Sequence, residues 1–266
     1  MTRIIIQLDE RFDTMSVKRG KNHTFLGMDV NFKDDGKIGI TSKKYLEECI
    51  ESFGEPLNRK PPTPSKGDLF DIDSDSPRLC KAKSSLYHHI VAKLLYVAKC
   101  SRPDIDTTIA FMCIRVSKST EEDWIKLRRL LEYIQSTIND ERIVGVKDLC
   151  VMKTYVNALF AVHQDMKGYT GRLTTFGSGM VHHKLSKQSL NTKSSTESEL
   201  VGASDYLLFT IWVKRFLQEQ GYHVKESIFY QDNASAIKLE NSGRMSSGKK
   251  TRHADIRYFF IKDVVE

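Results

Sequence analysis

The middle of the chain repeats apolar residues every three or four positions, which is the spacing of helices that bury one face. This pattern predicts three helices, at residues 82–100, 104–118 and 119–137. Asp104 is expected to cap the second helix, and Ser119 or Thr120 is expected to cap the third. We therefore take residues 84–148 as a helical unit, in which no side chains indicate chemistry of their own.

The segments before this unit predict short strands and a linker. Residues 1–12 predict a short strand followed by a charged turn, and residues 24–53 predict a strand, an Asp-Gly turn, a second strand and an amphipathic helix. Residues 54–83 hold five of the six prolines and end in a Ser/Asp-rich run, which is typical of an extended linker or surface loop. The first division of the chain is thus 1–53, and 54–83 joins it to the helical unit.

The pattern changes to strands near residue 149. Short apolar runs separated by glycines predict a three-stranded antiparallel meander, at 151–160, 171–179 and 180–186. A long helix, a strand and two further helices are predicted after it, at 195–221, 226–232, 233–241 and 250–266. This order predicts a mixed α/β (α+β) domain over 149–266, with helices packed on the faces of a mixed sheet.

Composition narrows the environment of the protein. No apolar run approaches the ~20 residues that span a bilayer, and the chain does not open with a secretory signal pattern. The five cysteines lack the spacing of a disulfide framework or a zinc site, which favours a reducing compartment. We expect no membrane partner and an intracellular location: the cytoplasm, a virus-like particle or the nucleus. The composition indicates no oligomeric state.

The net charge of +7 is compatible with a polyanionic partner, and its distribution is more informative than the total. The segments 182–196 and 241–254 contain no acidic residue. Such segments either bind phosphates or form ordinary solvated faces, and the sequence leaves both interpretations open. The candidate nucleic-acid contacts in and near them are Lys184, Lys187, Asn191, Lys193, Asn233, Lys249, Lys250 and Arg252.

Three acids hold positions that suit a shared site. Glu199 lies one turn into the long helix, Asp232 ends the strand after it, and Asp255 lies in the first turn of the last helix, two residues after His253. Each position also has an ordinary structural explanation, because acids favour first turns of helices and ends of strands. Their joint order is more specific than any one of them.

The motifs around these acids resemble a known family. The stretches "YVNALFAVHQDMKGYTG", "SKQSLNTKSSTESELVGAS", "YQDNASAIKLE" and "KTRHADIRYFFIKD" make residues 151–266 similar to the ribonuclease H domain of copia-type retrotransposons. The stretches "FLGMDV", "LYHHIVAKLLYVAKCSRPDIDTTIAF" and "DWIKLRRLLEYIQST" make residues 25–140 similar to the end of the reverse transcriptase of such elements, after its catalytic palm. The resemblance thus points to a segment of a copia-type Pol polyprotein.

The resemblance implies a ribonuclease H-like fold with a five-stranded mixed sheet, preceded by a remnant of the reverse-transcriptase palm end and a helical thumb or connection-like segment. It also implies that Glu199, Asp232 and Asp255 hold the metal ions, with His253 beside them. The implied reaction is hydrolysis of the RNA strand of an RNA–DNA hybrid with two Mg²⁺ (or Mn²⁺) ions. The implied partner is that hybrid or another nucleic acid.

One position departs from the family pattern. Asn157 stands where the family carries its first catalytic aspartate, and an amide offers one neutral oxygen donor in place of a charged pair. Loss of one charge about 4 Å from a cation removes roughly 4 kcal/mol at an effective dielectric of 20, which corresponds to roughly a thousandfold in rate. We expect an incomplete two-metal site and impaired hydrolysis.

Three alternatives follow from this departure: a damaged nuclease, a slow nuclease that keeps its metals on three acids and water, and a non-catalytic module that binds hybrids or other nucleic acids.

The sequence also bears on polymerase activity. No Tyr-x-Asp-Asp motif is present, so we expect the chain to begin after the palm's active site and to lack DNA synthesis.

Overall fold

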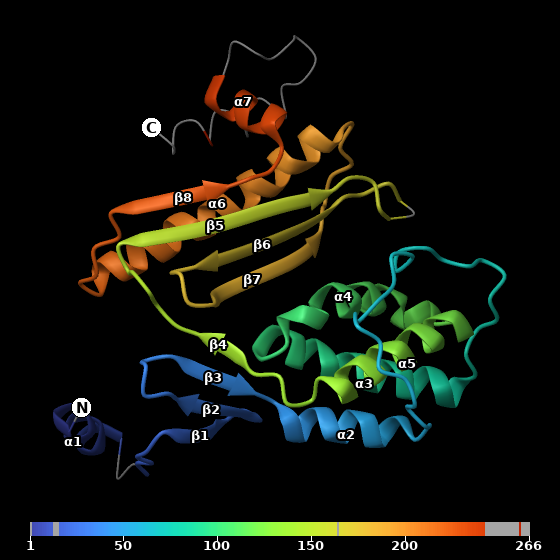
Figure 1. The fold of residues 1–266 in the computed structure, drawn as a ribbon, viewed down its shortest axis with the longest axis horizontal. Helices are drawn as coiled ribbons and strands as arrows, with labels where there is room; N and C mark the ends of the chain where they lie inside the picture. Colours follow the sequence, from blue (N-terminus) through green and yellow to red (C-terminus); the bar gives the residue numbers. More distant parts are fainter. Residues whose placement is uncertain (1, 13–15, 164, 243–260, 262–266) are drawn as a thin grey trace.

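Two separate four-stranded sheets flank a group of helices in the computed structural model, which describes residues 2–12, 16–163, 165–242 and 261 (Figure 1). The first sheet is antiparallel and has the order β1-β2-β3-β4, with bounds Asn22–Phe25, Met28–Phe32, Ile38–Thr41 and Arg142–Val144. The predicted Asp-Gly turn joins β2 to β3, with Gly36 at a φ of +79°. The pairing of β4 with β3 brings two segments about a hundred residues apart in sequence into one sheet.

The prediction of a strand at the start of the chain is wrong. Residues Thr2–Phe12 form the helix α1. Ile5, Leu8 and Asp9 are its partly buried positions, and this spacing of three and four matches one face of a helix. The run of β-branched isoleucines favoured a strand locally, and the burial of one helical face outweighs that preference.

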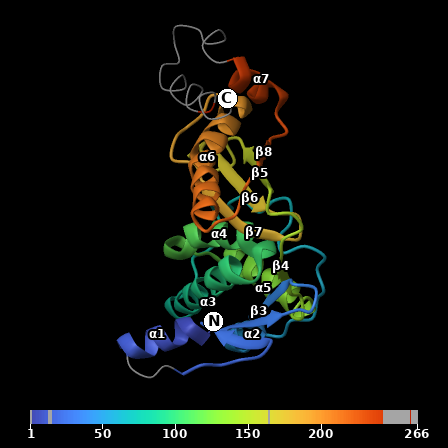
Figure 2. The ribbon, with the colours of Figure 1, turned by 90° about the vertical axis from the view of Figure 1, so that its left-hand side faces the viewer.

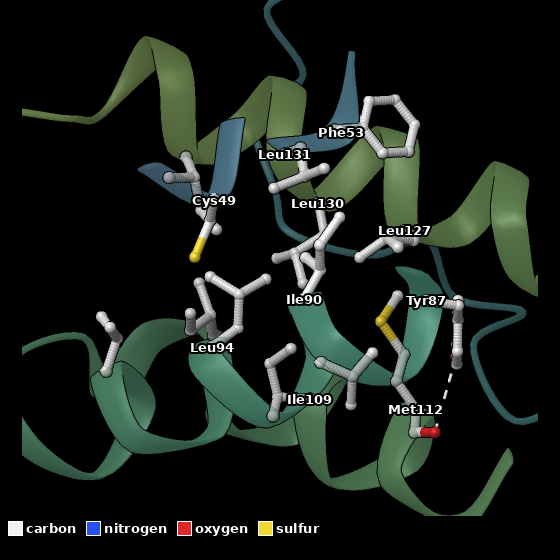
Figure 3. Close-up of a cluster of buried hydrophobic side chains, with 14 of the residues drawn as sticks. Cys49, Phe53, Tyr87, Ile90, Leu94, Ile109, Met112, Leu127, Leu130 and Leu131 are labelled. Atoms are coloured by element: carbon white, nitrogen blue, oxygen red, sulfur yellow. Dashed lines mark hydrogen bonds between the residues drawn. The ribbon is translucent and has the colours of Figure 1, made fainter. Parts of the chain in front are cut away.

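In the structure α2 packs with the predicted helices, and we include it in the helical unit, which then has two longer helices, two shorter helices and two 3₁₀ turns. Its elements are α2 (Lys43–Phe53), α3 (Lys81–Cys100), η1 (Pro103–Ile105), α4 (Asp106–Arg115), η2 (Val116–Lys118) and α5 (Glu121–Ser136). Their apolar faces meet in one continuous buried cluster (Figure 3), in which Ile90 and Leu94 of α3, Ile109 of α4 and Leu130 of α5 are fully buried. The predicted helices are therefore confirmed.

The ends of these helices correct one prediction and confirm another. Thr120 caps α5 in a reciprocal capping box with Asp123, as the sequence indicates. Asp104 does not cap a helix; it lies in η1 and accepts hydrogen bonds from Arg102 at 2.7 and 2.9 Å. The guanidinium of Arg102 is almost fully buried and needs a carboxylate partner, and α4 begins only at Asp106.

The proline-rich segment, residues 54–80, lies against α5 as a strap, and α3 begins at Lys81, within the end of the expected linker. Glu55 of the strap accepts a hydrogen bond from Trp124 Nε1 at 3.0 Å and pairs with Arg128. Lys126 donates to the carbonyl oxygens of Leu69 and Asp71 at 3.2 and 2.6 Å. These contacts hold an irregular segment on a regular helix.

The second sheet has the order β7-β6-β5-β8. The meander is confirmed: β5 (Val151–Leu159), β6 (Tyr169–Thr175) and β7 (Met180–Lys187) are antiparallel neighbours, and β8 (Glu226–Tyr230) pairs parallel with β5. The described residues give four strands here rather than the five that the resemblance implies, so the mixed α/β class is confirmed only at this level. Within the described residues, no helix is long and apolar enough to cross a membrane.

The helix α6 (Ser195–Glu219) lies across one face of this sheet, and α7 (Ala234–Ser242) packs on α6 (Figure 1). The helix α6 begins at Ser195, as predicted; Ser194 caps it by accepting from Glu197 N, and Gly221 follows its end at a φ of +85°. The predicted last helix lies outside the described residues except for Ile261, which is helical and buried.

The helical unit contacts the second sheet directly, as Figure 2 shows from the side. Asp106 of α4 is fully buried and lies 3.4 Å from His183 Nε2 on β7. Arg142 of β4 donates to the carbonyl oxygens of Cys100 on α3 and Met180 on β7, at 2.8 and 3.3 Å. Phe70 of the strap contacts the rings of His163 and Tyr169 at 5.6 and 5.9 Å between centroids, which adds an aromatic contact to the junction.

Candidate functional site

The alternation of side chains along β5 decides where Asn157 points. Val156 and Ala158 are buried toward α6, whereas Tyr155, Asn157 and Leu159 lie on the opposite, exposed face. The amide of Asn157 therefore does not interrupt the core. It opens onto a cleft of about 510 Å³, and no hydrogen bond from another described residue engages its side chain.

Glu199 reaches the edge of β5 from the second turn of α6. The parallel pairing of β8 with β5 ends at Tyr155 and Tyr230, so the backbone N–H of Ala158 lies beyond the end of β8. Glu199 Oε1 accepts that N–H at 2.7 Å, and the residue is only 4% exposed. The helix thus places a carboxylate beside the strand residue that follows Asn157.

Asp232 comes from the end of β8. It is exposed, follows Gln231 directly after the strand, and lines the same cleft as Asn157. The carboxyl end of a strand is a common place for ligand-binding groups in open sheets. Three of the predicted residues, Asn157, Glu199 and Asp232, are therefore gathered at one end of β5 and β8.

The electrostatics of this end favour a cationic partner. Burial raises the pKa of Glu199 above its ordinary value, and the charge of Asp232 raises it further, although the Ala158 N–H and Gln231 oppose the shift. A cation placed near both carboxylates would offset the repulsion between Glu199 and Asp232. In kind, their oxygen donors suit a hard divalent ion such as Mg²⁺.

Sequence reasoning missed a further carboxylate, Glu240 of α7. The amide of Gln231 lies between two acids: its nitrogen donates to Glu199 Oε2 at 3.4 Å, or, with the amide turned over, to both oxygens of Glu240 at 3.0 and 3.2 Å. Burial and the charge of Glu199 raise the pKa of Glu240 to about 7. The only signal in the sequence is the helical spacing that puts Glu240 one turn after Ala236, on the buried face of α7.

Some of the other predicted residues lie in the described part of the chain, and the rest lie outside it. Lys184 and Lys193 are exposed, while Lys187 pairs with Asp165 at 2.7 Å. Asn191 donates to the carbonyl oxygen of Asp165 at 3.0 Å, and Asn233 accepts from Ala236 N at 3.0 Å at the start of α7. The predicted residues outside the described part are His253, Asp255, Lys249, Lys250 and Arg252.

Asp165 is not placed to replace the missing aspartate, because its carboxylate is engaged by Lys187 in the loop between β5 and β6. Within the described residues, no three His, Cys, Asp or Glu side chains form a group that could hold a metal ion. Of the predicted metal ligands, the described part of the chain thus contains the acids Glu199 and Asp232 and the amide Asn157.

Comparison with known proteins confirms the resemblance to copia-type Pol polyproteins. The sequence is 30% identical over 265 residues to the "Retrovirus-related Pol polyprotein from transposon TNT 1-94" of Nicotiana tabacum, covering 97% of this chain and 20% of the relative. It is 24% identical over 271 residues to the "Retrovirus-related Pol polyprotein from transposon RE1" of Arabidopsis thaliana, covering 97% and 18%. The chain therefore spans about a fifth of the length of these relatives.

A shorter relative is also similar. An uncharacterized mitochondrial protein of Arabidopsis thaliana is 25% identical over 203 residues, covering 75% of this chain and 80% of the relative. No protein-family model matches the chain, and no solved structure matches it.

Proposed function

We propose that this chain, which is homologous to one segment of the retrovirus-related Pol polyproteins of copia-type transposons, carries a ribonuclease H-like site for the RNA strand of RNA–DNA hybrids, and that Asn157 impairs this site. One observation carries the proposal: Asn157 and Asp232 line one cleft, while Glu199 binds the backbone next to Asn157. Three elements distant in sequence thereby supply oxygen donors to one end of a sheet.

In this proposal Glu199 and Asp232 hold a divalent cation, with the amide oxygen of Asn157 as a weaker third donor. A bound Mg²⁺ or Mn²⁺ pair would supply the activation of water and the stabilisation of the leaving oxygen. The chain's own part is to fix the donors: the Ala158 N–H orients Glu199, and the Gln231 amide contacts its second oxygen. Asp255 and His253 are the further residues that the resemblance assigns to this task.

Asn157 is the reason to expect weak hydrolysis. A neutral amide leaves the cation with one charge less than an aspartate at the same position. This deficit reduces the affinity of the site for divalent ions and the stabilisation of charge during cleavage.

A second candidate function is binding of a nucleic acid without cleavage. The rings of Tyr155 and Tyr230 stack at 4.6 Å between centroids with an interplanar angle of 10°, and both residues line the cleft. Exposed aromatic faces are suited to stacking with the bases of a strand. This surface does not depend on the acids, so it would remain after loss of catalysis.

The two functions are separated by one cleavage assay. The parent chain, Asn157→Asp and the double variant Asn157→Asp/Glu199→Gln are incubated with an end-labelled RNA–DNA hybrid in Mg²⁺ or Mn²⁺. We expect Asn157→Asp to cleave the RNA strand roughly a thousandfold faster than the parent. The double variant should lose this gain, because Glu199 is needed to hold the cation.

Gel-shift binding of the same hybrid is measured in parallel. Binding by all three proteins without cleavage by any of them would favour the non-catalytic function. Strong cleavage by the parent chain would contradict the impaired site. A non-cleavable DNA duplex serves as the control for contamination by other nucleases.

A further inference from the structure

A second cavity lies in the helical unit, away from the sheet that carries the candidate site. The strap of residues 54–80 crosses α5 and the start of α4, and together they enclose about 560 Å³. This volume is within the range of pockets that hold small organic ligands. Pro56, Pro64, Leu69 and Ile125 give the cavity apolar walls.

Two deeply buried polar side chains line this cavity. Glu132 of α5 is 6% exposed and Thr108 of α4 is 1% exposed. The Oγ1 atom of Thr108 is buried without a hydrogen-bond partner, and the side chain of Glu132 lines the same cavity. A buried polar group without a partner is costly, so Thr108 points to a ligand that forms hydrogen bonds, and Glu132 offers such a ligand a carboxylate acceptor.

The remaining charges of the cavity favour an anionic group on the same ligand. Lys126 and Arg128 also line it, but each already pairs with an acid, Glu122 and Glu55 respectively. Arg59, Lys66 and Arg129 line it without an ion pair to any described residue.

The acid Asp68 at the exposed part of the strap offsets only one of these three cations. Arg129 is held toward the strap, because its NH2 group donates to Thr63 Oγ1 at 3.1 Å. The cavity therefore combines a buried acceptor with more accessible cations.

We propose that this cavity binds a guanine nucleotide. The N1–H and 2-amino groups of guanine form two parallel hydrogen bonds with one carboxylate, which matches Glu132, and Thr108 lines the same cavity. The flat base fits between prolines and aliphatic side chains, and the phosphate meets Arg129, Arg59 and Lys66. A free nucleotide and a guanine at the end of a nucleic-acid strand share this chemistry.

The strap is fixed before any ligand arrives. Glu55, Thr63, Leu69, Asp71 and Asp73 of the strap all contact side chains of α5. A cavity that is already formed loses less conformational entropy on binding. This site is separate from the residues of the proposed nuclease function, and its test does not depend on that function.

Binding is measured by isothermal titration calorimetry on the full chain with GMP, IMP, AMP and guanosine. IMP lacks the 2-amino group, and its affinity is expected to be about tenfold weaker than that of GMP. AMP lacks both guanine donors and should bind more weakly still. Guanosine tests the phosphate, and a short RNA ending in guanine distinguishes a strand end from a free nucleotide.

Glu132→Gln is the decisive variant, because it keeps the shape of the side chain and removes its charge. Its affinity for GMP should fall about tenfold to a hundredfold, since the two hydrogen bonds lose their charged acceptor. Glu121→Gln is the matched control on the same helix; Glu121 pairs with Lys83 outside the cavity, and its replacement should leave GMP affinity unchanged.

The order GMP, then IMP, then AMP on the parent chain supports the proposal even where the variant folds poorly. No GMP binding at millimolar concentration, equal affinity for GMP and AMP, or a folded Glu132→Gln chain that keeps its GMP affinity would overturn it.

Discussion

The helical unit and the second sheet differ in the kind of side-chain packing that stabilises them. In the helical unit, side chains from α2, α3, α4 and α5 form one continuous apolar cluster (Figure 3). Among the described residues, the second sheet has two smaller clusters, one toward α7 and one toward the start of β5. Within this part of the chain, apolar burial contributes more to the stability of the helical unit than to that of the sheet.

Hydroxyl groups fill much of the space between the second sheet and α6. Thr174 of β6 lies 3.0 Å from the hydroxyl of Tyr206, which in turn lies 2.8 Å from His182 Nδ1. Thr154 lies 3.5 Å from both Thr174 and Thr210. Such a network is directional, and it fixes the position of α6, from which Glu199 reaches the strand. The helical unit thus acts mainly as a scaffold, whereas the polar network of the second sheet and α6 sets the geometry of the candidate site.

The largest effect on stability should come from the scaffold. Leu130→Ala removes a fully buried side chain from the continuous cluster and should lower the free energy of unfolding by roughly 3 kcal/mol. Leu207→Ala in the smaller cluster of the second sheet should cost less, because Leu207 is 7% exposed and has fewer apolar neighbours. Urea unfolding of both variants measures the difference. Equal losses would remove the contrast between the units.

A middle-sized effect is expected at the junction of the two units. Asp106 is buried and accepts hydrogen bonds from Lys99 at 2.7 Å, with His183 at 3.4 Å. Asp106→Asn should cost about 2 kcal/mol at neutral pH, because Lys99 loses the carboxylate that accepts its hydrogen bonds. Denaturant unfolding of the variant against the parent measures this loss.

The same variant has a pH dependence. Burial alone would raise the pKa of Asp106, but His183 and Lys99 outweigh it and hold the pKa below its ordinary value. The unfolded chain therefore takes up this proton first as the pH falls, and the stabilisation by Asp106 is lost below about pH 4. The gap between parent and Asp106→Asn should shrink at pH 3. A gap that stays constant would argue against the charged pairing.

The smallest effect should arise at His182, which stacks on Phe209 at 4.0 Å. Burial lowers the pKa of His182 to about 4, and the charges of His183, Lys184, Arg142 and Lys99 add to the shift. Between pH ~6.5 and pH ~4 the unfolded chain binds a proton that the folded chain does not, so stability falls as the pH falls through this window.

His182→Asn should flatten that part of the pH profile of thermal unfolding. His223→Asn, at an exposed position, is the control and should leave the profile unchanged. A His182→Asn profile with the same slope as the parent between pH 6.5 and 4 would contradict the assignment.

Local signals in the sequence were sufficient for much of the fold. The capping box at Thr120, the turn at Gly36 and the glycine-separated meander each depend on residues close in the chain, and each is confirmed. The proximity of Asn157, Glu199 and Asp232 at one end of the sheet, in contrast, was implied by the family resemblance and by no local signal.

Features that depend on distant partners could not be predicted in this way. The strand β4 pairs with β3 across about a hundred residues, and nothing in its three residues indicates that partner. Asp104 has the sequence position of a helix cap, but the buried Arg102 beside it engages its carboxylate. Glu132 and Glu240 lie on helices like many other acids, and only the packing of the strap and of α7 makes them notable.

Divalent-ion binding by the parent chain and by Asn157→Asp tests the central claim most directly. Calorimetric titration with Mg²⁺ and Mn²⁺ is performed on both, with Asn31→Asp as a control that adds the same charge to the exposed strand β2. We predict that Asn157→Asp binds at least about tenfold more tightly than the parent and that Asn31→Asp does not. Equal ion affinity of the parent and Asn157→Asp would contradict the account of an oxygen-donor site that lacks one charge.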